Sequence, residues 1–269
     1  MIEKVNMYHP DKLCDRVGGA IVDWVISQDE NARVAVEVMC GHGLCTIMVE
    51  SNVEVIRPVS KSIVERIIGD DIKIKLISVP QDTHLADNQK DEVRCGDNGI
   101  FKGVPLSREE IELTSIAHEI CEKYPTDGKY ILDEKTNTLI VCQSCCDSDE
   151  LKKELERKYP QYNIIVNPLG DWTGGVSVDT GCTNRKIGSD LYKSVTGGGI
   201  QGKDASKADV SVNIFAWLQA QKFGKTHEYF CAIGDTEING IPYSEIVRVA
   251  KEYINTIGGY EALAEWGLY

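Results

Sequence analysis

The sequence predicts an α+β fold made of three similar units, each combining helices with a small sheet. Apolar residues recur at helical spacing in some segments and alternate with polar residues in others. The order helix, strand, strand, helix, strand occurs twice and partly a third time, with a period of roughly 95 residues. Because strands and helices both carry an apolar face, we expect the sheets to pack together with the helices outside.

The first unit follows from the pattern up to residue 79. Its expected elements are a helix over residues 11–27, strands over 32–40 and 44–50, a helix after Pro58 and a strand over 72–79. Gly41-His42-Gly43 separates the first two strands, which is typical of a hairpin. The last strand alternates apolar with polar residues, as a half-buried strand does.

The second unit repeats this order, and the third repeats it less completely. Ser107 and Glu110 have the spacing of a capping box at the start of a helix. The expected elements of the second unit are a helix from there to about residue 124, strands over 130–133 and 138–145, a helix over 149–159 and a strand over 162–166. Those of the third are a helix over 205–222, strands over 228–234 and 236–239, and a helix over 243–257. The predicted repeats are residues 14–96, residues 1–13 with 97–170, and residues 171–269.

Composition excludes several classes of function. Lys plus Arg is 29 and Asp plus Glu is 42, so the net charge is −13. Such a surface repels nucleic acid and anionic membranes, and a polyanionic ligand would need a local basic pocket. No apolar run reaches the roughly 20 residues that cross a bilayer. Met1-Ile2-Glu3-Lys4 has no apolar signal-peptide region, and we therefore expect a cytoplasmic protein.

The ten cysteines are expected to be reduced, as thiols are in that compartment. The one dense group, Cys142-Gln143-Ser144-Cys145-Cys146, has the spacing of half a zinc site. A second such pair and nearby histidines are missing from the sequence, so thiols on a strand are the favoured interpretation.

A glycine-rich segment at residues 197–209 indicates a phosphate site. Its glycines allow main-chain amides to approach phosphate oxygens. Lys203 and Lys207 are one helical turn apart, so both can face one ligand. Asp209 adds a carboxylate of the kind that binds Mg²⁺. The segment is not a P-loop, because Asp204 follows the lysine. A flexible loop before a capped helix is the weaker interpretation.

A second charged motif, Tyr8-His9-Pro10-Asp11-Lys12, lies where a helix is expected to begin. Pro10 suits the first helical turn and Asp11 the positive end of the helix dipole. A well-capped helix explains these residues without any function. The same residues also offer a hydrogen-bond donor, a metal ligand and a phosphate-binding cation.

Four charged motifs occur together and in order: His9–Lys12, Gly96–Gly99, Asp179–Lys186 and Gly197–Asp209. In this combination the chain resembles the S-adenosylmethionine synthetases, also called methionine adenosyltransferases. The resemblance extends over most of the chain and all three repeats. It implies three similar α/β domains around a pseudo-threefold axis, in agreement with the repeat.

The resemblance implies a reaction in which the sulfur of L-methionine attacks ribose C5′ of ATP, and the triphosphate leaves and is hydrolysed to pyrophosphate and phosphate. His9 is expected beside the ribose and the leaving oxygen. The expected catalytic residues are His9, Lys12, Lys129, Arg185, Lys203 and Lys207. The expected ATP-binding residues are these six together with Asp127, Trp172, Asp179 and Lys186, with Trp172 stacking on adenine.

The resemblance also implies the remaining ligands. Methionine is expected at Glu50 and Asp97, with Gln89 as a helper. Two Mg²⁺ ions are expected at Asp11 and Asp209, and K⁺ at Glu37. The expected assembly is a homodimer or a dimer of dimers with active sites shared between subunits. Local structure alone also explains several of these residues: Glu37 and Glu50 as solvent-facing strand positions, Asp127-Gly128-Lys129 as a turn and Trp172 as core.

The chain departs from the family pattern in several places. It is shorter than typical members, and its glycine-rich loop is one residue shorter. Asp171 stands where the family has arginine, the Gly41-His42-Gly43 hairpin differs, and the gating segment near residues 88–94 is hard to match. Two other activities therefore stay open: a triphosphatase or nucleotide hydrolase without methionine transfer, and a non-catalytic regulatory partner of a full-length synthetase.

Overall fold

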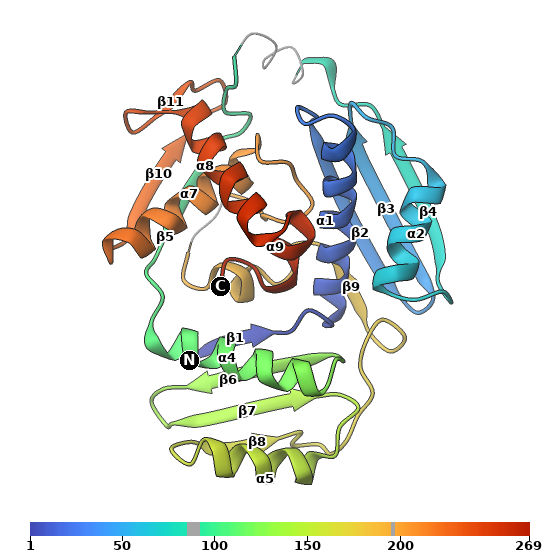
Figure 1. The fold of residues 1–269 in the computed structure, drawn as a ribbon, viewed down its shortest axis with the longest axis vertical. Coiled ribbons are helices and arrows are strands. Elements are labelled where there is room, and N and C mark those ends of the chain that lie inside the picture. The colour runs from blue at the N-terminus through green and yellow to red at the C-terminus, as the bar shows by residue number, and fades with distance from the viewer. Residues whose placement is uncertain (85–91, 195–196) are drawn as a thin grey trace.

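The computed structural model describes residues 1–84, 92–194 and 197–269. Three α/β units surround a common centre, each with its own sheet (Figure 1). The predicted α+β fold of three similar units is thereby confirmed.

The first unit contains a four-stranded sheet in the order β4-β3-β2-β9. Its elements are α1 (Pro10–Gln28), β2 (Val34–Gly41), β3 (Leu44–Ser51), α2 (Arg57–Ile67), β4 (Lys73–Val79) and β9 (Thr180–Cys182). The predicted hairpin is present, because β2 and β3 pair antiparallel from Val34↔Ser51 to Gly41↔Leu44. His42 and Gly43 form its turn, with φ of 50° and 79°.

The second unit contains a sheet in the order β1-β6-β7-β8. Its elements are β1 (Ile2–Val5), α4 (Arg108–Lys123), β6 (Gly128–Asp133), β7 (Thr138–Gln143), α5 (Ser148–Lys158) and β8 (Asn163–Val166). The predicted capping box of α4 is present, with Ser107 accepting from the Glu110 N–H at 3.2 Å. Strand β1 was not predicted, because four residues are too short for a clear alternation.

The third unit has shorter strands. Its elements are β5 (Gly99–Gly103), α6 (Ile187–Leu191), α7 (Ala208–Phe223), β10 (His227–Cys231), β11 (Glu237–Ile238), β12 (Ile241–Pro242), α8 (Tyr243–Ile257) and α9 (Tyr260–Trp266). Strand β5 pairs with β10, although the sequence division groups residues 97–170 with the second repeat. Strand β9 pairs with β2 of the first unit in the same way. Elsewhere the division into repeats stays a prediction.

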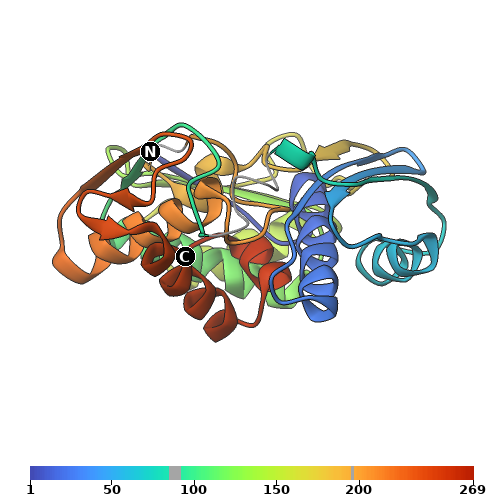
Figure 2. The same ribbon diagram turned by 90° about the horizontal axis from the view of Figure 1, so that it is seen from above.

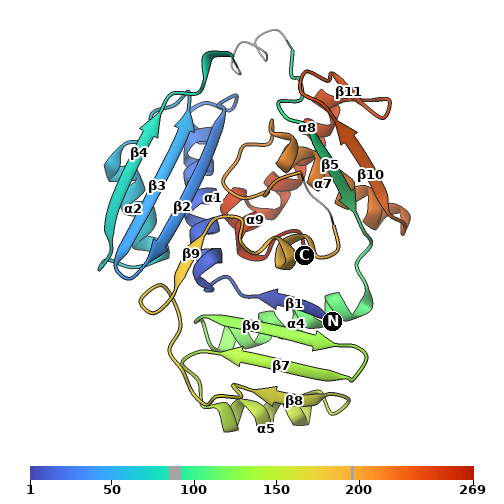
Figure 3. The ribbon, with the colours of Figure 1, turned by 180° about the vertical axis from the view of Figure 1, so that it is seen from behind.

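The helices and the strands lie on opposite sides of the molecule (Figures 2 and 3). Three clusters of buried apolar side chains are centred on the three units. The helix-free faces of the sheets leave several large apolar side chains exposed, among them Met39, Met48, Ile100 and Phe230. Within the described residues, no helix is long and apolar enough to span a membrane.

Helix α1 joins the first unit to the C-terminal helices by close main-chain contact. A Cβ atom at Gly19 would lie 2.5 Å from the Tyr260 carbonyl oxygen, so only glycine permits this approach. The Asp23 carboxylate accepts the N–H groups of Tyr260 and Glu261 at 2.8 and 2.9 Å, which caps the start of α9.

Lys4 of β1 joins the second unit to the same C-terminal segment. Its side chain is buried and donates to the main-chain oxygens of Ser189 at 3.1 Å and Trp266 at 2.7 Å. The ammonium group also lies 3.8 Å from the ring centroid of Tyr269. Burial lowers the pKa of Lys4 to about 7, against the opposing attraction of Asp190.

We predict that Lys4→Met lowers the free energy of unfolding by about 2–4 kcal/mol, because it leaves buried main-chain oxygens without a donor. Urea unfolding of both proteins measures the difference. Lys61→Met, at an exposed position of α2, is the control. Equal effects of the two substitutions would show that the Lys4 contacts do not stabilise the fold.

Candidate functional site

His9 and Asp11 stand at the start of α1. His9 is the residue before the helix, and its Nδ1 accepts the Asp11 N–H at 3.2 Å. Burial, with a further contribution from Lys186, lowers the pKa of His9 to about 4. The imidazole is therefore neutral at neutral pH. Since Nδ1 is the acceptor, its proton is assigned to Nε2.

The Asp11 carboxylate is 1% exposed and draws two cations together. Lys186 Nζ lies 2.5 Å from Oδ2, and Arg185 Nε lies 3.4 Å from Oδ1. The Cys182 N–H also donates to Oδ1 at 2.8 Å. This contact fixes β9 against the start of α1, so that the residues after β9 deliver their side chains to Asp11.

Three further predicted residues flank His9 and Asp11. Lys129 of β6 and Asp179 before β9 both act electrostatically on His9. Asp127 accepts the Gly175 N–H at 3.0 Å, and burial raises its pKa to about 6. We call the resulting group the α1 cluster; its members are His9, Asp11, Asp127, Lys129, Asp179, Arg185 and Lys186.

Lys12, one residue beyond Asp11, faces the interior instead. It is 0% exposed, and its Nζ lies 2.5 Å from Asp190 Oδ1 and 3.3 Å from Asp15 Oδ2. Burial alone would lower the pKa of Lys12, but the attraction of Asp190 and Asp15 outweighs it and raises the pKa. One helical position beyond Asp11 thus turns the Lys12 side chain toward the core, and its expected phosphate contact stays a prediction.

The glycine-rich segment is fixed against the edge of β2. The Val36 N–H donates to the Gly202 carbonyl at 2.6 Å, and the main chain of Lys203 forms an isolated antiparallel β-bridge with Ala35. Lys203 Nζ lies 2.6 Å from Asp209 Oδ2 at the start of α7. Lys207 is the residue before α7, because this helix begins at Ala208, three residues after its predicted start.

Asp209 has a carboxylate oxygen that fits a metal ion. Its Oδ1 is buried and has no hydrogen-bond partner among the residues that the structure describes. Both oxygens lie close to Gly198, where a Cβ atom would approach them to 2.6–2.7 Å. Across the described ranges, no group of three or more His, Cys, Asp or Glu side chains could hold a metal ion. Mg²⁺ at Asp11 or Asp209 would therefore need oxygens from a ligand or water, which is its usual mode of binding with phosphates.

The predicted methionine and potassium residues lie on the strand side. Glu37 and Glu50 point away from the helices on β2 and β3, because Val36, Val38 and Val49 next to them are buried. Glu37 accepts a short hydrogen bond from the Thr183 hydroxyl. Asp97 precedes β5 and accepts the Asn98 N–H at 2.7 Å. Gln89 lies outside the described residues.

Trp172 borders a cavity of about 380 Å³ beside the second unit. Cys142 of β7 and residues 167–172 line it. The Trp172 indole donates to Asn167 Oδ1 at 3.0 Å, which holds the ring at the cavity edge, about one third exposed. Asp171 accepts the Ser148 N–H at 3.2 Å and so stabilises the start of α5. The acidic residue that replaces the family's arginine thus has a structural partner.

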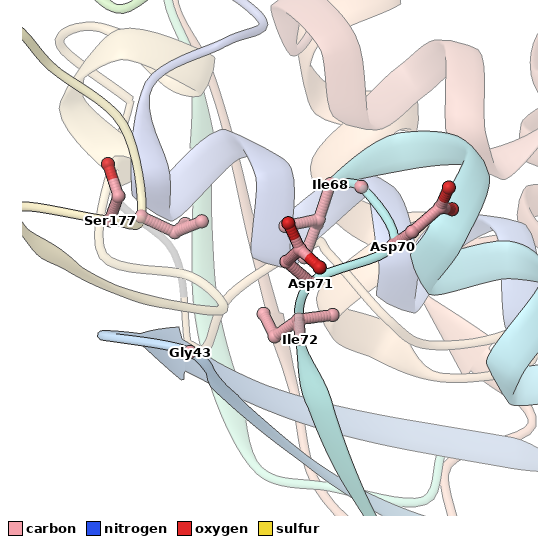
Figure 4. Close-up of a pocket in the computed structure, with 8 residues that line it drawn as sticks. Gly43, Ile68, Asp70, Asp71, Ile72 and Ser177 are labelled. Carbon is pink, nitrogen blue, oxygen red and sulfur yellow. The ribbon is translucent and has the colours of Figure 1, made fainter.

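Another cavity, of about 270 Å³, lies at the β2–β3 turn (Figure 4). Gly43, the end of α2 with Asp70 and Asp71, and Ser177 line it. None of the predicted site residues borders it, so its geometry does not connect it to the α1 cluster.

Sequence reasoning missed the residues that fix the site. Asp15, Asn184, Asp190 and Gln201 form hydrogen bonds that link α1, the residues after β9 and the glycine-rich segment. The sequence did offer a signal for Asp15, because it lies one helical turn after Lys12 and a buried lysine needs a charged partner. Asp190 and Gln201 gave no such signal, since their contacts join distant parts of the chain.

Comparison with known proteins supports the motif reading. Residues 1–79 match the description "S-adenosylmethionine synthetase, N-terminal domain". An S-adenosylmethionine synthase of Mycoplasma capricolum is 29% identical, covering 98% of this chain and 84% of the relative. That of Mesoplasma florum is 28% identical, covering 81% and 73%.

The fold agrees with a solved structure described as an unusual S-adenosylmethionine synthetase from Campylobacter jejuni. The TM-score is 0.78 over 100% of this chain and 93% of the other, at 17% identity. The fold is therefore the one seen in that structure, and the sequence relatives confirm the predicted resemblance. The chain is similar in sequence to S-adenosylmethionine synthases over most of its length, and its predicted enzyme class, methionine adenosyltransferase, is the class of these relatives.

We predict that Asp15 makes stability depend on pH. Burial raises the pKa of Asp15 to about 7, far above its value in the unfolded chain. The folded protein therefore binds this proton more tightly, and the stability it contributes is lost as the pH rises through about 7. Relative to Asp15→Asn, the wild type should lose about 2 kcal/mol between about pH 5 and pH 8.

Urea unfolding at the two pH values measures this change, with the exposed Asp70→Asn as the control. A difference between wild type and Asp15→Asn that does not change with pH would mean that Asp15 is ionised throughout.

Proposed function

We propose that this protein forms S-adenosylmethionine from ATP and L-methionine. The methionine sulfur attacks ribose C5′, the triphosphate leaves, and the triphosphate is then hydrolysed to pyrophosphate and phosphate. The observation that carries the proposal is the α1 cluster, in which a buried carboxylate concentrates Lys186 and Arg185 beside a neutral histidine. In a chain of net charge −13, such a cluster is a local site for a polyanion.

The chemistry of the first step suits these side chains. A thioether is nucleophilic without losing a proton, so attack on C5′ needs no general base. The leaving oxygen gains negative charge, and the Nε2–H of neutral His9 can donate a hydrogen bond to it. Correct alignment of sulfur, C5′ and the leaving oxygen supplies a further part of the acceleration.

Cations from two parts of the chain would hold the phosphates. The α1 cluster offers Lys129, Arg185 and Lys186, and the glycine-rich segment offers Lys203 and Lys207. Lys186 and Lys203 are held by carboxylates at 2.5 and 2.6 Å, so a triphosphate would compete with Asp11 and Asp209 for them. Trp172 would stack on adenine, with Asp127 and Asp179 near the ribose and the metal–phosphate region.

The same carboxylates are the proposed metal ligands. Asp11 and Asp209 would hold two Mg²⁺ ions, and Glu37 would hold K⁺. Bound Mg²⁺ would neutralise charge that develops on the leaving triphosphate. The unpaired Asp209 Oδ1 supports this assignment, because a buried carboxylate oxygen without a donor favours a cation.

Glu50 and Asp97, with Gln89, would bind the methionine amino group. Glu50 of β3 pairs with Ala35 of β2 and lies on the helix-free face of the first sheet. Ala35 is two residues before Glu37 on β2, so the two carboxylates are close neighbours on this face. On this open face, a carboxylate gains its full attraction for an ammonium group only when water is excluded. We infer that another surface covers it.

We propose that a second copy of the chain covers this face, as a homodimer or a dimer of dimers with shared sites. Met39 and Met48 lie beside Glu37 on the first sheet and are 58% and 49% exposed. Ile100 and Phe230 are directly paired on the third sheet and are 53% and 57% exposed. Apolar side chains gathered on one side of a protein are typical of an interface. We place the protein in the cytoplasm, where its ten free cysteines would stay reduced.

We predict that purified protein incubated with ATP, methionine, Mg²⁺ and K⁺ yields S-adenosylmethionine by mass spectrometry. Lys203→Ala should lower the rate about 100-fold or more, because it removes a positioned phosphate-binding cation. Lys225→Ala, at an exposed position after α7, is the matched control and should have little effect. Phosphate release without the sulfonium product would favour a triphosphatase. Nucleotide binding without either product would favour a regulatory partner.

We predict that Phe230→Asp dissociates the dimer and lowers synthesis at least 10-fold, because a charge on the apolar face would be buried without a partner. Analytical ultracentrifugation measures the mass in solution. Phe223→Asp is the control, since Phe223 is 54% exposed on the helix α7 instead. A dimer that persists in Phe230→Asp would place the interface elsewhere.

A further inference from the structure

Asn184 holds the glycine-rich segment through its side-chain amide. Its Oδ1 accepts the Gln201 N–H at 2.9 Å, and its Nδ2 donates to the Gln201 carbonyl at 3.2 Å. The amide thus satisfies both main-chain groups of one residue, as a neighbouring strand would. The register of the segment is fixed at Gln201, two residues before Lys203.

Close packing supports this contact. A Cβ atom at Gly199 would lie 2.1 Å from Cγ of Asn184, so the glycine main chain lies directly on the amide. Asn184 has φ of 62°, in the left-handed region that asparagine tolerates better than most residues. Its own N–H donates to Asp15 Oδ1 at 2.8 Å, which anchors this conformation on α1.

Gln201 is held a second time through its side chain. Its Nε2 donates to Asp190 Oδ2 at 2.9 Å, and the other oxygen of Asp190 lies 2.5 Å from Lys12 Nζ. Beyond Gln201, the chain runs along β2 through the contact between Gly202 and Val36. Lys203 therefore extends from a main chain that is fixed on both sides of Gln201.

We propose that Asn184 is a positioning residue, which sets the place of Lys203 by pairing with Gln201. The inference rests on the proposed function for the role of Lys203, and it gives a role to a residue of the Asp179–Lys186 motif that had none. Without the Asn184 amide, the N–H and the carbonyl of Gln201 both lose these hydrogen bonds. The glycine-rich segment can then shift relative to Asp209 and β2.

The test compares Asn184→Gly with Asn239→Gly. Glycine keeps the left-handed conformation and removes only the amide. Asn239 is a matched control, because it also has a positive φ, of 52°, and its Nδ2 donates to a main-chain oxygen, that of Glu228, at 3.1 Å. It lies in the β11–β12 turn, outside the site residues.

We expect Asn184→Gly to lower kcat/KM for ATP about 10-fold or more, with KM for methionine within about twofold of wild type. Asn239→Gly should leave both unchanged. In a Lys203→Ala background, Asn184→Gly should have little further effect, because the residue that it positions is gone. Equal kinetics for the two glycine variants, or additive losses with Lys203→Ala, would overturn the proposal.

Amide hydrogen exchange separates this inference from the proposed function. Asn184→Gly should speed exchange at Gln201, while Asn239→Gly should not, whether or not the wild type forms S-adenosylmethionine. Unchanged protection at Gln201 would overturn the positioning role by itself. If Asn184→Gly does not fold, Asn184→Asp keeps the side-chain size but places an oxygen against the Gln201 carbonyl. Asn184→Asp should show the same loss of kcat/KM for ATP and the same faster exchange at the Gln201 amide. Wild-type kinetics and exchange in this variant would overturn the proposal.

Discussion

The buried ion pair between Lys12 and Asp190 is the contact on which the site depends. It joins α1, near the start of the chain, to α6 across 178 positions. Lys12 Nζ lies 2.5 Å from Asp190 Oδ1 and 3.3 Å from Asp15 Oδ2, so two buried carboxylates share this cation. Burial accordingly raises the pKa of Asp15 to about 7. Breaking one partner of such a pair leaves a charge without compensation, which costs about 3–5 kcal/mol in other proteins.

The other fixed contacts follow from this one. Asp15 holds the Asn184 N–H, Asp190 holds the Gln201 side chain, and Asn184 and Gln201 are paired with each other. These hydrogen bonds link four residues in a row, and Lys12, which lies beside both Asp190 and Asp15, closes the row into a ring. Arg185 and Lys186 follow Asn184 in the chain, and Lys203 follows Gln201. The side chains of these cations are exposed or half-buried, whereas the neighbouring main chain is attached to the core. Such support for charged groups that face a ligand is what electrostatic catalysis requires.

The sequence predicted the regular elements well and the connections poorly. Helix α1 and the β2–β3 hairpin were foreseeable, because spacing and turn residues are local signals. Strands β5 and β9 were not, since each is short and pairs with a strand outside its own predicted repeat. The charged motifs also contain the residues of the α1 cluster, but they did not indicate that Lys12 faces the core. Adjacent helical positions point about 100° apart, so a motif alone cannot tell which of its residues faces the ligand.

The pairing of cations with carboxylates would allow an acidic protein to bind the proposed polyanionic substrate. Unpaired lysines at one site would repel one another, whereas Lys186 and Lys203 each rest on a carboxylate at 2.5–2.6 Å. A triphosphate would offer each ammonium group a stronger partner, and a carboxylate released in this way becomes free to bind a cation. Asp209 already has one oxygen in that state. Phosphate binding and metal binding would then strengthen each other, which explains why the motifs combine lysine and aspartate without a nucleophile and its base.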